Sequence, residues 1–191
     1  MSDLQTTGEK IGSVAVLLNG APERLVLDVM ALLLQEYPKV GGSAFQHAVA
    51  CVRQRFRSSA AEALTETTLL ISEMQRVGHL PKIRLARRRS VEKDEVLLVA
   101  LLAALQHGDR ARAIEAAIAL LDTGHVYGVL AAARSLAALM KEHGLMLRPV
   151  SAELFNYQVG YPTVADLGAR RLERPAPEQP KKPVLRLLKS A

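Results

Sequence analysis

The sequence predicts an all-α protein, and three observations support this prediction. The apolar residues, 49% of the chain, are mostly Leu, Ala and Val, whereas aromatic residues make up 4% and tryptophan is absent. Leu and Ala lose little conformational entropy in a helix. Apolar residues recur at three- and four-residue spacing, and glycine or proline follows most periodic stretches. A chain of 191 residues with this apolar content is long enough to bury a hydrophobic core.

Three helices are expected in the first part of the chain. The first runs from Pro22 to about Tyr37, and the second covers residues 45–56. Ser59 is a suitable N-cap for the third, which ends before Gly78. The second helix is amphipathic, with a basic side that carries Arg53, Gln54, Arg55 and Arg57.

Three further helices are expected after a short connector. Ser90 is the expected N-cap of the first, which ends at His107 and carries its acidic residues in the first turn, namely Glu92, Asp94 and Glu95. The next helix ends near Asp122, and the last runs from about Val126 to His143. Because the joints are short, consecutive helices should pack as antiparallel neighbours.

The expected architecture is six or seven short helices in two antiparallel three-helix blocks, followed by a disordered basic tail. The segments are a helical block at 1–78, a basic connector at 79–90, a second block at 91–147, a partly ordered extension at 148–173 and a flexible tail at 174–191. The extension has room for one short helix near Ser151 to Tyr157. Residues 174–183 read RPAPEQPKKP, a composition typical of an extended, mobile spacer.

Several function classes find no support in the sequence. The single Cys51 excludes an internal disulfide and a thiolate-rich zinc site. No phosphate-binding glycine loop, nucleotide fingerprint or serine elbow is present, so we expect no cofactor and no enzymatic activity. The longest apolar run, Val96 to Leu105, is about half the length of a membrane span and predicts a buried core helix. The polar start of the chain lacks the features of a secretory signal, which favours the cytoplasm.

The strongest functional signal is the basic connector. Residues 53–91 carry a net charge of +6, and the connector has five cations to offer to backbone phosphates, namely Lys82, Arg84, Arg87, Arg88 and Arg89. Phosphate contacts would give affinity without sequence specificity. The alternative is a solvated loop whose arginines cap the preceding helix or pair with the acidic residues that open the next one.

The end of the tail is the other candidate. A short apolar cluster on a flexible tether can dock into a groove of a partner protein, and here it consists of Val184, Leu185, Leu187 and Leu188. The alternative is that this segment folds back on its own domain.

Residues 101–139, LLAALQHGDRARAIEAAIALLDTGHVYGVLAAARSLAAL, followed by PTVADL at 162–167, resemble the helical C-terminal region of IstA-type insertion-sequence transposases. The resemblance covers residues 101–170 and implies a partner-binding role linked to mobile DNA or plasmids. The integrase-type catalytic core of that family is absent. The chain reads GARRLE at 168–173, without the Tyr-Asp pair that often follows the family's terminal motif, and no active-site residue is carried over.

These observations predict a non-enzymatic accessory or regulatory protein. Its helical body would bind a protein partner, and its connector would contact nucleic acid. The alternative is a purely protein-binding adaptor that uses helix grooves and the LRLLK segment at 185–189. An enzyme with a dispersed active site is a third, unsupported possibility. A homo-oligomer is compatible with either binding role, and no membrane association is expected.

Overall fold

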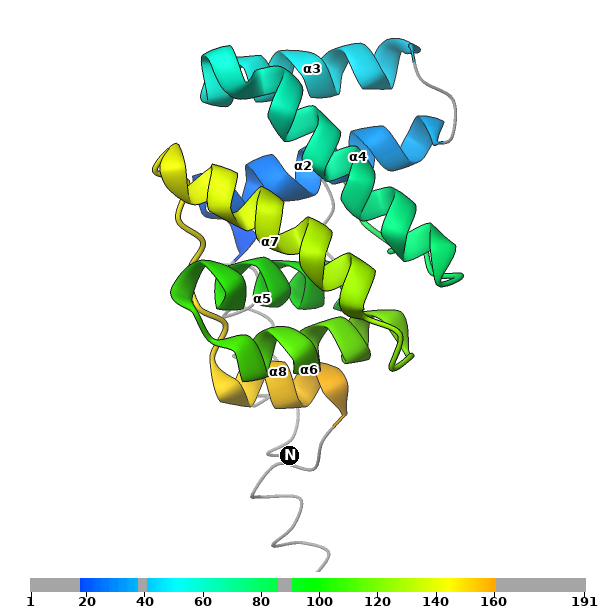
Figure 1. Ribbon diagram of the computed structural model, residues 1–191, viewed down its shortest axis with the longest axis vertical. Helices are drawn as coiled ribbons and strands as arrows, with labels where there is room; N and C mark the ends of the chain where they lie inside the picture. Colours follow the sequence, from blue (N-terminus) through cyan, green and yellow to red (C-terminus); the bar gives the residue numbers. More distant parts are fainter. Residues whose placement is uncertain (1–17, 38–40, 86–90, 161–191) are drawn as a thin grey trace, which may run out of the picture. The chain divides into compact units, whose positions relative to one another are not determined.

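The computed structural model describes residues 18–37, 41–85 and 91–160, and within these ranges the protein is all-α, with no strand (Figure 1). The elements in chain order are α2 (Ala21–Glu36), α3 (Ser43–Phe56), the 3-10 turn η1 (Arg57–Ser59), α4 (Ala60–Arg76), α5 (Lys93–His107), α6 (Arg110–Leu121), α7 (Tyr127–Glu142) and α8 (Ala152–Val159). The fold class predicted from the sequence is therefore confirmed. No helix in the described ranges combines the length and the apolar character needed to cross a membrane.

Helix α5 is the core helix of the C-terminal half. All nine of its residues from Val96 to Ala104 are buried, as the continuous apolar run predicts. A helix that is apolar on every side needs cover on every side. The short joints return the chain onto α5 each time, so that α6, α7 and α8 all pack against it.

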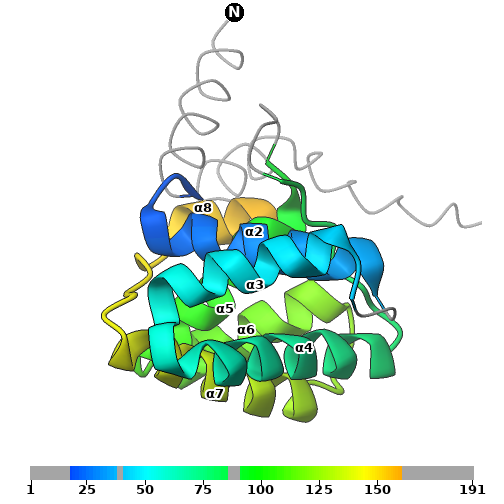
Figure 2. The ribbon, with the colours of Figure 1, turned by 90° about the horizontal axis from the view of Figure 1, so that it is seen from above.

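The N-terminal helices join the same hydrophobic core. Helix α2 packs against α3, and α4 packs along α7; both views of the ribbon show α4 and α7 side by side (Figures 1 and 2). Buried residues of α4 and α7, such as Met74 and Leu136, belong to one continuous cluster. The two three-helix blocks expected from the sequence are thus parts of one compact unit.

A glycine in the first turn of α7 permits this close approach. A Cβ atom on Gly128 would lie 2.8 Å from Nη2 of Arg76 and would overlap the carboxylate of Glu73. Glu73 and Arg76 form an ion pair on α4, with Nη2 and Oε2 2.8 Å apart. The pair therefore rests directly on the backbone of α7, because no side chain intervenes.

Two helix caps differ from the sequence-based expectation. Ser59 is at the N-cap of α4, but its side chain makes no capping hydrogen bond. Ser90, the expected cap of α5, lies outside the described residues, and the N-cap is Glu92. Glu92 and Glu95 form a capping box, in which the backbone N–H of Glu92 donates to Oε2 of Glu95 over 3.1 Å. A glutamate pair satisfies two free N–H groups at once, and this arrangement sets the start of the helix.

A buried glutamine ties the segment between α7 and α8 to α5. Gln106 is only 4% exposed, and its side-chain amide donates to the carbonyl oxygen of Leu145 over 3.0 Å. Its Oε1 accepts the backbone N–H of Leu147 over 2.8 Å. Leu147 is itself buried, and Leu145 is partly buried, so the side chain of Gln106 supplies partners to backbone groups that have limited access to water. The side chain of Gln106 thus replaces the hydrogen bonds that a strand or helix would provide.

We predict that Gln106→Leu lowers the free energy of unfolding by about 2–3 kcal/mol, because the buried N–H of Leu147 and carbonyl of Leu145 would lose their partners. Urea denaturation followed by circular dichroism measures this change. Gln75→Leu, at an exposed position of α4, is the matched control and should change stability by less than about 0.5 kcal/mol. Equal effects of the two substitutions would contradict this role of Gln106.

Candidate nucleic-acid interface

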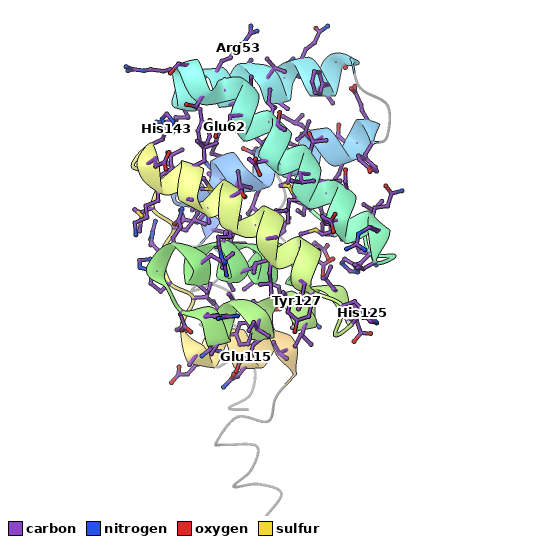
Figure 3. All side chains as sticks on the ribbon, viewed as in Figure 1. Arg53, Glu62, Glu115, His125, Tyr127 and His143 are labelled. Atoms are coloured by element: carbon purple, nitrogen blue, oxygen red, sulfur yellow. The ribbon has the colours of Figure 1, made fainter. Side chains whose placement is uncertain are left out.

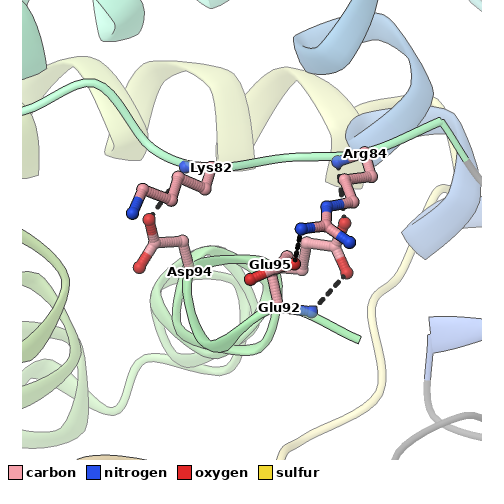
Figure 4. Close-up of polar contacts among 5 residues, drawn as sticks. All are labelled: Lys82, Arg84, Glu92, Asp94 and Glu95. Carbon is pink, nitrogen blue, oxygen red and sulfur yellow. Dashed lines mark hydrogen bonds and ion pairs between the residues drawn. The ribbon is translucent and has the colours of Figure 1, made fainter. Parts of the chain in front are cut away.

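The described part of the connector, residues 79–85, lies against the first turn of α5 (Figure 4). The backbone N–H of Lys82 donates to Oδ2 of Asp94 over 2.8 Å. Two residues further on, the backbone N–H of Arg84 donates to Oε1 of Glu95, also over 2.8 Å. Alternate backbone N–H groups of an extended chain point in the same direction, so both reach carboxylates of the same helical turn. The acidic first turn of α5 therefore fixes the path of the connector.

The guanidinium of Arg84 is also matched by an acid. Its Nη2 lies 2.6 Å from Oε1 of Glu92, and the contact is partly exposed. This is the alternative in which connector arginines pair with the acidic residues that follow them. Around Lys82 and Arg84 stand three carboxylates, those of Glu92, Asp94 and Glu95, which oppose the approach of a phosphate.

The remaining residues expected to form binding sites lie outside the described ranges. They are the connector cations Arg87, Arg88 and Arg89 and the apolar tail residues Val184, Leu185, Leu187 and Leu188. Of the five expected nucleic-acid contacts, the structure thus describes Lys82 and Arg84. Lys82 keeps an exposed side chain, whereas that of Arg84 is held by Glu92.

A second group of cations lies at the C-terminal end of α3. Arg53, Arg55 and Arg57 are all exposed, and in the described part of the chain no acidic side chain pairs with any of them. We call these three residues the α3 arginine cluster; Figure 3 shows Arg53 on the outer side of the helix. The cluster combines a high density of positive charge with free access to solvent.

Buried neighbours hold the cluster in place. Val52 and Phe56 alternate with the arginines and are 1% and 3% exposed. The ring of Phe56 meets His143, the C-cap residue of α7, edge to face, with the ring centroids 5.2 Å apart. The last turn of α3 is therefore anchored to the body, and the arginines project from a fixed backbone.

The backbone at Arg57 is unusual. Its φ is 49° and its ψ is −110°, a combination that residues with a side chain rarely adopt. This conformation turns the chain from α3 into η1, and the N–H of Arg57 still donates to the carbonyl oxygen of Arg53. An arginine therefore occupies a corner where glycine would fit without strain.

The acid closest to α3 along the preceding chain is engaged at the other end of the helix. Glu36 accepts the backbone N–H groups of Ala44 and Phe45, over 2.9 and 3.2 Å, and so caps the start of α3. At a rise of about 1.5 Å per residue, the arginine cluster begins about 14 Å along the helix axis from the N–H group of Ala44 that Glu36 binds. The cluster keeps its charge because no acidic residue occurs between Glu36 and Glu62.

This acid-free stretch is the signal by which the sequence points to the cluster. The sequence shows the basic side of the second helix, but it favours the connector as a binding site, because the connector has the denser run of cations. The number of acidic neighbours distinguishes the connector from the α3 arginine cluster. Three acids follow the connector within six residues of Arg89, and they bind its described part.

Two residues of α3, four positions apart, are of the types that serve as a nucleophile and its base or as metal ligands. His47 and Cys51 share a side of α3, His47 exposed and Cys51 partly buried. Within the described ranges no group of three or more His, Cys, Asp or Glu residues is placed to hold a metal ion. Helix α7 is a core helix and buries residues such as Val129, Ala133 and Leu136.

Comparison of the chain with protein-family models, with curated proteins and with solved structures found no match.

We predict that Glu95→Ala releases the connector. The substitution removes the acceptor for the N–H groups of Arg84 and Glu92, so amide hydrogen exchange in residues 79–85 should rise and unfolding should cost about 2 kcal/mol less. Mass spectrometry of the exchanged protein measures the first effect. Glu115→Ala, which removes a surface acid paired with Arg112, is the control and should leave the connector unchanged. Unaltered exchange in Glu95→Ala would show that other contacts hold the segment.

Proposed function

We propose that the protein is a non-enzymatic nucleic-acid-binding accessory protein, which contacts backbone phosphates through the α3 arginine cluster. The observation that carries this proposal is the exposure of Arg53, Arg55 and Arg57 without an acid partner in the described structure. Arginine is suited to phosphate because its planar guanidinium can donate two parallel hydrogen bonds. Each contact also releases counterions from the nucleic acid, which favours binding.

The rest of the exposed side of α3 is compatible with this role. Gln46, His47 and Gln54 are exposed polar residues that can donate hydrogen bonds to phosphates or sugars, and none of them is acidic. The cations lie at the C-terminal end of the helix, whereas groove-reading helices use mainly their N-terminal residues to reach bases. We therefore expect binding that depends weakly on base sequence.

The connector arginines extend the proposal beyond the described residues. Arg87, Arg88 and Arg89 follow directly on a segment that Asp94 and Glu95 fix to α5. Three further cations on an anchored chain would increase the number of phosphate contacts. The resemblance of residues 101–170 to IstA-type transposases supports a role near mobile DNA as a further part of this proposal.

We predict that the triple substitution Arg53→Gln, Arg55→Gln and Arg57→Gln weakens binding to a short DNA duplex by at least about tenfold at low salt. Fluorescence anisotropy of a labelled duplex measures the affinity. The slope of log affinity against log salt concentration should fall by up to about 3, since each phosphate contact contributes about 0.9.

A variant with the same loss of charge controls for net charge alone. Arg24→Gln, Arg110→Gln and Arg134→Gln remove three exposed arginines from α2, α6 and α7. When both triple variants are compared in about 0.1 M salt, binding by this control should stay within about twofold of the parent, because long-range attraction is screened within about 10 Å at that salt concentration. Equal losses in the two triple variants would overturn the assignment to α3.

A third variant tests the connector. Arg87→Ala, Arg88→Ala and Arg89→Ala together should remove most of the remaining salt-dependent affinity when added to the α3 triple substitution. Full binding by this connector variant alone would remove these residues from the interface. If the unsubstituted protein shows no binding to duplex DNA even at low salt, the proposed function is wrong.

A further inference from the structure

A groove on the opposite half of the molecule from α3 has the features of a protein-docking site. It lies between the end of α5, helix α6 and helix α7, and has a volume of about 210 Å³. Its floor is apolar, formed in part by Leu105, Ile114 and Leu130. Arg110 of α6 and Arg134 of α7 stand among its lining residues.

An exposed tyrosine borders this groove. Tyr127 is the first residue of α7, and 84% of its surface is accessible to solvent. Tyr127 also lines a second hollow, of about 310 Å³, together with Val77 and His125. Figure 3 shows Tyr127 and His125 close together near the start of α7. Tyrosine and arginine are the residue types that contribute most to binding energy at protein interfaces. Ile118, one helical turn beyond Ile114, is a further exposed apolar residue on α6.

The charge of the groove limits what can occupy it. Neither Arg110 nor Arg134 forms an ion pair within the described residues, whereas their neighbour Arg112 pairs with Glu115 over 3.3 Å. The guanidinium of Arg112 also lies over the ring of Phe155, 4.5 Å from its centroid. The acid of this helix is thus paired with Arg112, and two positive charges remain beside an apolar floor.

We propose that this groove binds an acidic, apolar segment of a partner protein, with large aliphatic or aromatic side chains on the floor and a carboxylate at each arginine. The pairing of an apolar floor with two free guanidinium groups favours such a segment over a nucleic acid, which has no aliphatic side chains to bury. The chain's own end is a poor occupant, because Arg186 and Lys189 stand beside Val184, Leu185, Leu187 and Leu188.

Selection from a random-peptide phage library, with the full-length protein immobilised, tests this proposal. The peptides that enrich should combine at least one Asp or Glu with two or more large apolar residues. The best of them, made synthetically, should bind in fluorescence polarisation, and Tyr127→Ala should weaken it by at least about tenfold, as expected for a central aromatic anchor. A selection that enriches no peptide, or peptides without acids, overturns the proposal.

Charge reversal distinguishes the groove from other surfaces. Arg110→Glu with Arg134→Glu should abolish binding of the acidic peptide and permit binding of the same peptide with Lys in place of each acid. Arg53→Gln with Arg55→Gln is the matched control and should leave peptide binding unchanged. If the reversed pair still binds the acidic peptide, or if Tyr127→Ala impairs DNA binding instead, the groove is not the docking site. These outcomes do not depend on whether α3 binds nucleic acid.

Discussion

The free N–H groups at the start of an α-helix need acceptors, and side-chain oxygens supply them at four of the described helices. Glu36 serves α3, Glu92 and Glu95 serve α5, and Asp109 serves α6 through the N–H of Arg112. At α8 the hydroxyl of Ser151 accepts the N–H of Leu154. Because these acceptors come from the chain just before each helix or from its first turn, each cap also fixes the direction in which the helix leaves its connecting segment.

The same use of carboxylates shapes the surface charge. Glu23, 1% exposed, accepts the backbone N–H of Arg148 over 2.8 Å and so joins α2 to the segment before α8. Glu36, Asp94 and Glu95 are engaged with backbone groups as well. These acids are directed at backbone N–H groups and form no ion pair with the arginines at the end of α3 or with Arg110 and Arg134. In the described ranges, exposed arginines without an acid partner therefore include those at the end of α3 and those beside the groove of α6 and α7.

The sequence predicts the helices well because their determinants are local. Pro22, Gly108 and the apolar spacing lie within a few residues of the boundaries that they set, and the run from Val96 identifies the core helix without knowledge of its neighbours. The cap of α5 is less predictable, since serine is a preferred N-cap type and glutamate, which occupies the N-cap here, is not. The bonds from the connector to Asp94 and Glu95 depend on the path of the chain, which spacing does not reveal.

The candidate site is harder to predict from the sequence, because it also depends on the path of the chain. The value of an arginine as a phosphate contact depends on the acids around it in space. Arg84 stands in a dense basic run, yet Glu92 holds its guanidinium. Arg53 lies in a less dense basic run. Its guanidinium is not paired with Glu36, because Glu36 is at the far end of α3. Pairs such as Glu23 and Arg148, 125 residues apart, require the fold itself.

The corner at Arg57 combines backbone strain with an exposed charge. Backbone conformations of this kind cost a residue with a side chain on the order of 1 kcal/mol or more, and glycine adopts them freely. Glycine at this corner would relieve the strain but would remove one cation of the α3 arginine cluster. Stability and surface charge therefore make opposite demands at this one position, where α3 turns into η1.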